Sequence, residues 1–159
     1  MNYKQIFTIF VIFTFIAPLI GLFIQPGNNV TGNAVNEVIG GFADTGNQAI
    51  YENNSLVVWM FGLTTCDYCN WEKPVLERVA NDFGNSVTLK IYELDLTKDT
   101  NKMTSFEQQM FNAYSPSGNV PLIVIGNKYC RVGAGKSFGE ARETQYLTEL
   151  LNTILLSKT

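Results

Sequence analysis

Two cysteines separated by two residues, Cys66 and Cys69, are the side chains of this sequence best suited to chemistry. They follow closely on the apolar run at residues 56–61, which has the composition of a strand buried on both faces. A helix that begins here would offer unpaired N–H groups and partial positive charge, which favour a thiolate over a thiol. Cys66 could then attack a disulfide, and Cys69 could resolve the resulting mixed disulfide.

The same pair has two other interpretations, a purely structural disulfide and half of a zinc site. The sequence contains no histidine, and Cys130 is the only other cysteine, so zinc would have to be bound through carboxylates. A redox pair is therefore favoured, and no metal is expected. Cys130 is predicted to be a small buried hydrophobic side chain, or alternatively an accessory thiol that exchanges electrons with the pair.

The amino-acid composition narrows the kinds of function that the chain can have. The chain of 159 residues has a net charge of −3 and no basic cluster, which leaves nucleic-acid binding without an electrostatic basis. The absence of histidine removes the commonest general base. Catalysis would thus depend on cysteine or carboxylate groups.

Residues 6–24 contain no charged side chain, and as a helix they would be roughly 28 Å long, close to the thickness of a bilayer's hydrocarbon core. Lys4 precedes them, and the next basic residue is Lys73. The positive-inside rule therefore predicts residues 1–5 in the cytoplasm and the rest of the chain outside. We expect residues 1–24 to be an N-terminal membrane anchor or signal segment.

The length of this segment favours an uncleaved anchor. It exceeds the ~7–15 residues of a signal-peptide core, and no A-x-A site follows it. A signal peptide removed after export is the alternative, and both would place the domain in an extracytoplasmic location. A buried core helix is disfavoured because the segment is apolar all the way round.

Beyond this segment the sequence divides into a Gly/Asn-rich linker at residues 25–48 and one domain at residues 49–159. The domain alternates buried-strand patterns with helical stripes, in the order β-α-β-α-β-β-α, with a possible extra strand near residues 48–52. The predicted strands are 56–62, 87–94, 121–125 and 129–132, and the predicted helices follow residue 69 and cover 102–114 and 139–156. Early strand–helix–strand crossovers and a late hairpin indicate a mixed sheet covered by helices.

The order of these elements and the residues between them resemble the thioredoxin-like superfamily over most of residues 50–157. The Cys66–Cys69 pair lies between the central strand and its helix, and Pro74 stands where thioredoxins carry a helix-bending proline. The dipeptide Val120-Pro121 opens the third strand, where the family has a cis-proline facing the active site. Residues 132–134 also resemble the segment before the last helix.

The resemblance implies an α/β thioredoxin-like fold, with a central mixed sheet flanked by helices, and a protein thiol–disulfide oxidoreductase without cofactors. Cys66 would be the nucleophile and Cys69 the resolving cysteine. Substrates would be proteins with thiols or disulfides, which dock along Val120 and Pro121 by strand addition. The same analogy suggests a membrane quinone-linked redox partner.

Several residues depart from the family pattern. Thr65 stands where thioredoxin has tryptophan, and Met60 stands where it has a buried acid that accepts a proton; Glu52 and Asp95 are the candidate substitutes. Asp67 puts a negative charge beside the Cys66 thiolate, which opposes the effect of the helix dipole.

Tyr68 resembles the tyrosine of the glutaredoxin motif and is expected, with Asp67, to line the substrate site. Val120 is similar to its counterpart in bacterial disulfide oxidases. That likeness and the exported location favour disulfide formation or isomerisation. An anchored reductase supplied by a membrane electron donor is the other direction that the sequence leaves open. The alternative is a non-catalytic thioredoxin-like module that binds exported proteins and has a structural Cys66–Cys69 disulfide.

Overall fold

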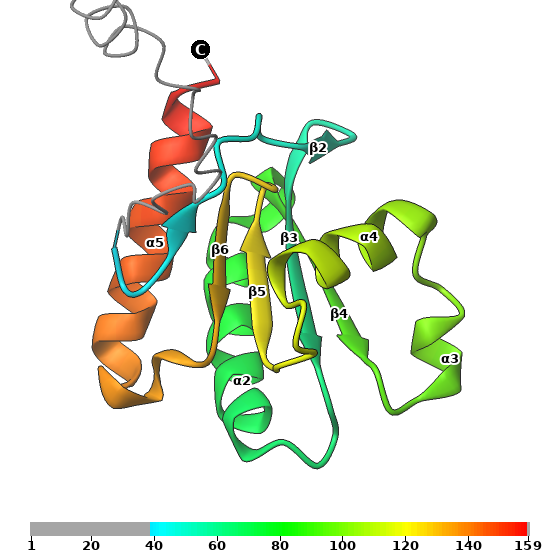
Figure 1. Ribbon diagram of the computed structural model, residues 1–159. Helices are drawn as coiled ribbons and strands as arrows, with labels where there is room; N and C mark the ends of the chain where they lie inside the picture. Colours follow the sequence, from blue (N-terminus) through cyan, green and yellow to red (C-terminus); the bar gives the residue numbers. More distant parts are fainter. Residues whose placement is uncertain (1–38, 159) are drawn as a thin grey trace, which may run out of the picture. The chain divides into compact units, whose positions relative to one another are not determined.

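The computed structural model describes residues 39–158 (Figure 1). The predicted anchor at residues 1–24 and the first part of the predicted linker lie outside this range. Within residues 39–158, no helix combines the length and the apolar character needed to span a membrane.

The sheet is built around β3 (Ser55–Gly62), in which every residue after Ser55 is buried. It runs parallel to β4 (Val87–Glu93) and antiparallel to β5 (Leu122–Ile125), so that Met60 lies between Ile91 and Ile123. A continuous apolar sequence suits this place because both faces of a central strand are covered.

The remaining strands extend the sheet from β5 and from the start of β3. β6 (Tyr129–Val132) returns antiparallel to β5 through a turn in which Gly126 and Asn127 have positive φ angles. β1 (Ala43–Asp44) pairs with β6, and β2 (Tyr51–Glu52) pairs with the beginning of β3. The sheet is therefore mixed, as predicted.

Helices cover both faces of the sheet (Figure 1). α2 (Asp67–Asp82) and α5 (Glu140–Leu156) pack on the face that carries Val58 and Met60. α4 (Ser105–Tyr114) packs on the opposite face, which carries Val57, Trp59 and Phe61. The alternation of β3 side chains between two apolar cores is the period-two pattern of a strand.

Short helices complete the connections: α3 (Thr97–Thr100) and the 3-10 turns η1 (Gly84–Ser86) and η2 (Gly135–Ser137). The helix predicted at 102–114 begins only at Ser105, because Thr104 caps it in a reciprocal arrangement with Glu107. With this change of boundary, the predicted order β-α-β-α-β-β-α is confirmed, and the extra strand expected near residues 48–52 is β2.

The end of the predicted linker differs from the structure. Phe42 is fully buried, and Ala43 pairs with Cys130 in the sheet. The guanidinium of Arg131 lies 4.3 Å from the centre of the Phe42 ring, and Arg131 also donates a hydrogen bond to the Gly40 carbonyl. Aromatic burial, a cation–π contact and strand pairing therefore hold residues 40–44 on the domain, ahead of the boundary predicted at residue 49.

Candidate active site

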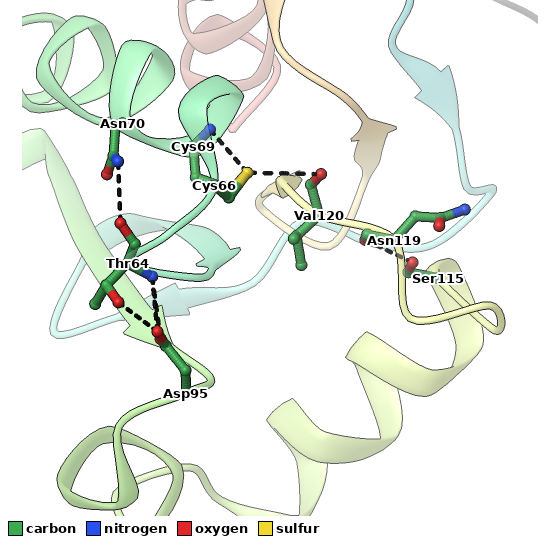
Figure 2. The surroundings of a disulfide bond; sticks show 8 residues. All are labelled: Thr64, Cys66, Cys69, Asn70, Asp95, Ser115, Asn119 and Val120. Atoms are coloured by element: carbon green, nitrogen blue, oxygen red, sulfur yellow. Dashed lines mark hydrogen bonds between the residues drawn. A yellow bond between two sulfur atoms is a disulfide. The ribbon is translucent and has the colours of Figure 1, made fainter.

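Cys66 and Cys69 form a disulfide at the N-terminus of α2, with their Cα atoms 5.2 Å apart. Cys66 is the N-cap residue, and its Sγ accepts a hydrogen bond of 3.1 Å from the Cys69 backbone N–H (Figure 2). The cap position is one that side-chain acceptors normally occupy, because the first N–H groups of a helix lack partners within it. The same N–H would stabilise negative charge on Cys66 Sγ in the reduced protein.

The two cysteines differ in exposure. Cys66 is partly exposed, whereas Cys69 is only 3% exposed and belongs to the core between the sheet and α2. Gly62, at the end of β3, makes room for it: a Cβ atom there would be 3.2 Å from Cys69 Cβ and 3.3 Å from its Sγ. An incoming sulfur can therefore reach Cys66, while Cys69 is positioned to act from within.

The segment that leads into β5, distant in the sequence, faces the disulfide. The Val120 carbonyl oxygen lies 4.0 Å from Cys66 Sγ (Figure 2), and the Val120–Pro121 peptide bond is cis, as predicted. The Ser115 hydroxyl donates to the Asn119 carbonyl, which fixes the turn before Val120. The Pro121 carbonyl accepts a hydrogen bond of 2.7 Å from the Gly133 N–H.

The order of the elements identifies the architecture. A β3-α2-β4 crossover is followed by the β5-β6 hairpin and α5, and the disulfide lies where β3 passes into α2, opposite the start of β5. The fold is thioredoxin-like. Pro74 lies inside α2, as the comparison with the helix-bending proline of thioredoxins predicted.

Similar solved structures include chloroplastic thioredoxin z, which is 19% identical and covers 64% of this chain and 80% of its own, with a TM-score of 0.44. A glutaredoxin from Archaeoglobus fulgidus is 22% identical, with coverage of 57% and 84% and a TM-score of 0.35. Glutaredoxin C1 from Populus tremula x tremuloides is 25% identical, with coverage of 64% and 80% and a TM-score of 0.37. No family model and no curated protein matches the chain.

Exposed apolar side chains lie in α2 and around η2. Tyr68, between the two cysteines, is 59% exposed, and Lys136 of η2 places its Nζ 5.5 Å from the centre of the Tyr68 ring. Val132 and Phe138, on either side of η2, are 44% and 43% exposed. Asp67 is the exposed first residue of α2, where its charge is favourable for the helix.

The structure does not place Glu52 or Asp95 as a proton acceptor for Cys69. Met60 is buried in β3 as expected. Glu52 pairs with Ser55 at the opposite end of β3 and binds Lys90. The Asp95 carboxylate accepts hydrogen bonds from Thr64 instead; these outweigh a small effect of burial and lower the pKa of Asp95.

Cys130 does not join the pair. It lies in β6 opposite Ala43 and Val124 and packs against the core around Trp59, whereas Cys69 belongs to the core on the other face. Burial raises the pKa of the Cys130 thiol, so it is a poorer nucleophile than an exposed cysteine. The position favours the packing role and not direct electron exchange with Cys66 and Cys69.

A buried charged cluster that the sequence pattern did not predict lies next to the site. Glu72 of α2 and Glu143 of α5 are fully buried, and Arg131 of β6 lies between them. Arg131 Nη2 is 3.1 Å from Glu72 Oε1 and 2.6 Å from Glu143 Oε1, and the Gly135 N–H donates to Glu72 Oε2. The position of Glu72, three residues from both Cys69 and Val75 on the buried stripe of α2, indicates that it is buried, although not which residues it binds.

Two carboxylates share one guanidinium in this cluster. Burial raises the pKa of Glu72 to about 8, because the attraction of Arg131 only partly offsets the cost of desolvation and Glu143 adds repulsion. Burial therefore favours the protonated form of Glu72 in this cluster. Gly135 is required here, since a Cβ atom would overlap the Glu143 carboxylate.

Within the described part of the chain, no group of three or more histidine, cysteine, aspartate and glutamate side chains is arranged to hold a metal ion.

Proposed function

We propose that this protein is a thiol–disulfide oxidoreductase acting on protein substrates through Cys66 and Cys69. One observation carries the proposal: the disulfide joins a partly exposed cysteine at a helix N-terminus to a cysteine that is buried in the core. A disulfide with a purely structural role does not require this asymmetry, whereas nucleophilic attack followed by intramolecular resolution does.

In the reducing direction, the Cys66 thiolate attacks a substrate disulfide, and a Cys66–substrate bond forms as the substrate S–S bond breaks. One substrate thiolate leaves and takes up a proton. Cys69 then loses its proton and attacks Cys66 Sγ, which restores the Cys66–Cys69 disulfide and releases the second substrate thiolate. The pair gives up two electrons, and the substrate gains them.

In the oxidising direction, the oxidised pair accepts electrons. A substrate thiolate attacks Cys66 Sγ, and Cys69 leaves as a thiolate that must be protonated. A second substrate thiolate then attacks the substrate sulfur of the mixed disulfide, which forms the substrate disulfide and releases Cys66 as a thiolate. We propose this direction, or isomerisation, as the physiological one, supported by Val120 and by the exported location that the N-terminal sequence predicts.

Substrate docking is proposed along the segment that faces Cys66. The Val120 carbonyl oxygen lies 4.0 Å from Cys66 Sγ and could accept a hydrogen bond from the backbone of an extended substrate. Pro121 directly precedes β5, and Tyr68, which is exposed, would contact the apolar part of the substrate. Asp67 would bias the site against acidic substrate segments.

The cellular setting is proposed from the sequence. Residues 1–24 would anchor the protein in the cell membrane, with the catalytic domain extracytoplasmic, or would be removed after export. A quinone-linked membrane oxidoreductase is the proposed partner for reoxidation.

Insulin reduction by dithiothreitol tests the activity, with the wild-type chain compared with Cys66→Ser. The matched control is Cys130→Ser, which removes the thiol on the other face of the sheet. We expect Cys66→Ser to abolish catalysis and Cys130→Ser to retain it. Equal rates for wild type and Cys66→Ser would instead favour the non-catalytic binding module with a structural disulfide.

A further inference from the structure

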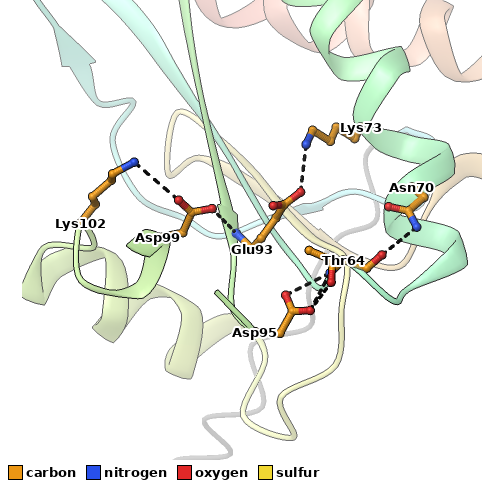
Figure 3. Close-up of polar contacts among 7 residues, drawn as sticks. All are labelled: Thr64, Asn70, Lys73, Glu93, Asp95, Asp99 and Lys102. Carbon is orange, nitrogen blue, oxygen red and sulfur yellow. Dashed lines mark hydrogen bonds and ion pairs between the residues drawn. The ribbon is translucent and has the colours of Figure 1, made fainter. Parts of the chain in front are cut away.

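Thr64, two residues before Cys66, has all three of its polar groups hydrogen-bonded although it is exposed (Figure 3). Its N–H donates to both carboxylate oxygens of Asp95, at 3.0 and 3.1 Å, and its hydroxyl donates to Asp95 Oδ2. Its carbonyl accepts a hydrogen bond of 3.0 Å from Asn70 Nδ2.

These bonds connect three separate segments around the disulfide. Thr64 follows β3, Asp95 follows β4, and Asn70 lies in the first turn of α2, next to Cys69. The Leu94 N–H donates to the Gly62 carbonyl, which continues the pairing of β3 and β4 to the residue before Asp95. The loop that carries Cys66 is therefore held on one side by the sheet and on the other by α2.

A second link between the same elements lies nearby. Lys73 Nζ of α2 is 3.0 Å from Glu93 Oε1 at the end of β4 (Figure 3). This ion pair fixes the helix to the sheet without contacting the loop. Asp95 differs from this ion pair because its hydrogen bonds are made to Thr64, in the loop itself. An exposed carboxylate contributes little to the stability of the core.

We propose that Asp95 is a positioning residue for Cys66, which acts through Thr64 to keep Cys66 Sγ on the helix N-terminus and opposite the Val120 carbonyl. The consequence for chemistry is that Asp95 sets how readily Cys66 becomes a nucleophile. The relevance of this role to turnover rests on the proposed oxidoreductase function, but the effect on Cys66 itself does not.

Charge and position have opposite effects, and this makes them separable. The negative charge of Asp95 disfavours a thiolate nearby, whereas the ordered loop favours one by keeping Cys66 Sγ at 3.1 Å from the Cys69 N–H. Asp95→Asn removes the charge and keeps a carbonyl oxygen that can accept from Thr64. Asp95→Ala removes both.

The test is the pH midpoint of Cys66 alkylation by iodoacetamide in the reduced full-length chain, followed by mass spectrometry of the Cys66 peptide. Variants are Asp95→Ala, Asp95→Asn, Thr64→Val and the double variant Asp95→Ala/Thr64→Val. Asp82→Ala, an exposed aspartate at the far end of α2, is the matched control. Melting temperatures are measured for all of them.

We expect the midpoint of Asp95→Ala to lie about half a pH unit or more above that of Asp95→Asn, roughly threefold in reactivity at fixed pH. Asp95→Ala and Thr64→Val both remove the same hydrogen bond, the one between the Thr64 hydroxyl and the Asp95 carboxylate. The midpoint of the double variant should therefore differ from that of Asp95→Ala by less than the midpoint of Thr64→Val differs from that of wild type. Asp82→Ala should match wild type.

Equal midpoints for Asp95→Asn and Asp95→Ala would mean that Asp95 acts on Cys66 only through its charge, which would overturn the proposal. Additive effects of the two substitutions in the double variant would overturn it as well. Alkylation requires no turnover, so the result is distinct from a failure of the oxidoreductase function. Inactivity of the wild-type chain toward insulin would overturn that function and leave the positioning of Cys66 measurable.

Discussion

The Val120 carbonyl oxygen and Cys66 Sγ lie 4.0 Å apart although 54 residues separate them in the sequence. β5 pairs antiparallel with β3, so the start of β5 meets the end of β3, where α2 begins. The sheet thus brings a backbone acceptor close to Sγ of the partly exposed Cys66. In the proposed function, this carbonyl is the acceptor for the backbone of an extended substrate.

Asp67→Asn should make Cys66 alkylate faster at pH 7, since it removes a negative charge next to the thiolate. The change should also cost the helix up to about 1 kcal/mol, because Asp67 is favourable in the first turn of α2. Iodoacetamide kinetics on the reduced protein measure the first effect, and urea unfolding of the oxidised protein measures the second. Slower alkylation in Asp67→Asn would contradict this interpretation of the charge.

The buried cluster predicts a loss of stability as the pH rises. The pKa of Glu72 is raised to about 8 in the folded protein, so its protonated form contributes stability that is complete below about pH 4.5 and is lost as the pH increases through 8. The chain has no histidine, so few other groups titrate in this window. The free energy of unfolding should fall by on the order of 2–4 kcal/mol from pH 5 to 8.5.

Glu72→Gln is the matched variant for that slope, because glutamine has the shape of the protonated acid and cannot ionise. Urea unfolding of the oxidised form at pH 5, 6.5, 7.5 and 8.5 should show a flatter profile for Glu72→Gln. Parallel profiles for the two proteins would show that Glu72 does not hold the proton.

For Glu107 we expect the opposite pH dependence of stability, in the acid range. Burial alone would raise its pKa, but hydrogen bonds from the Thr104 N–H and the Trp59 indole outweigh this and lower the pKa of Glu107 to about 2. Its contribution to stability is therefore present above about pH 4.5 and lost as the pH falls toward 2. Glu107→Gln should shrink the loss of stability between pH 5 and 3 by on the order of 2 kcal/mol.

Trp59 fluorescence reports this change locally, because its Nε1 is 2.9 Å from Glu107 Oε1. Lys90 Nζ also lies 3.3 Å from the same oxygen, and Glu52→Gln, which removes the other partner of Lys90, is a useful control. An acid profile in Glu107→Gln as steep as in wild type would refute the assignment.

The strands and helices near the site were predictable because their side-chain patterns are strong. β3 is a continuous apolar run, and β6 follows a turn with Gly126 and Asn127. The cysteine pair could be placed between β3 and α2 for the same reason. β1 was missed because two residues paired with β6 leave no periodic pattern.

The polar contacts of the site could not be predicted from the sequence. Arg131 meets Glu72 across 59 residues and Glu143 across 12, and only the packing of α2, β6 and α5 brings them together. Asp95 reaches Thr64 because β3 and β4 are parallel and end at the same edge. No local sequence pattern indicates either the contacts of Arg131 or the contact between Asp95 and Thr64.

The most direct test of the central claim is which cysteine forms the mixed disulfide with a protein substrate. Reduced Cys69→Ala and Cys66→Ala variants are incubated with a disulfide-containing protein, and the adducts are mapped by mass spectrometry. We predict that Cys69→Ala accumulates a substrate adduct at Cys66, whereas Cys66→Ala forms almost none, because Cys69 is only 3% exposed. Equal adducts at both positions, or none at Cys66, would contradict the roles assigned to the pair.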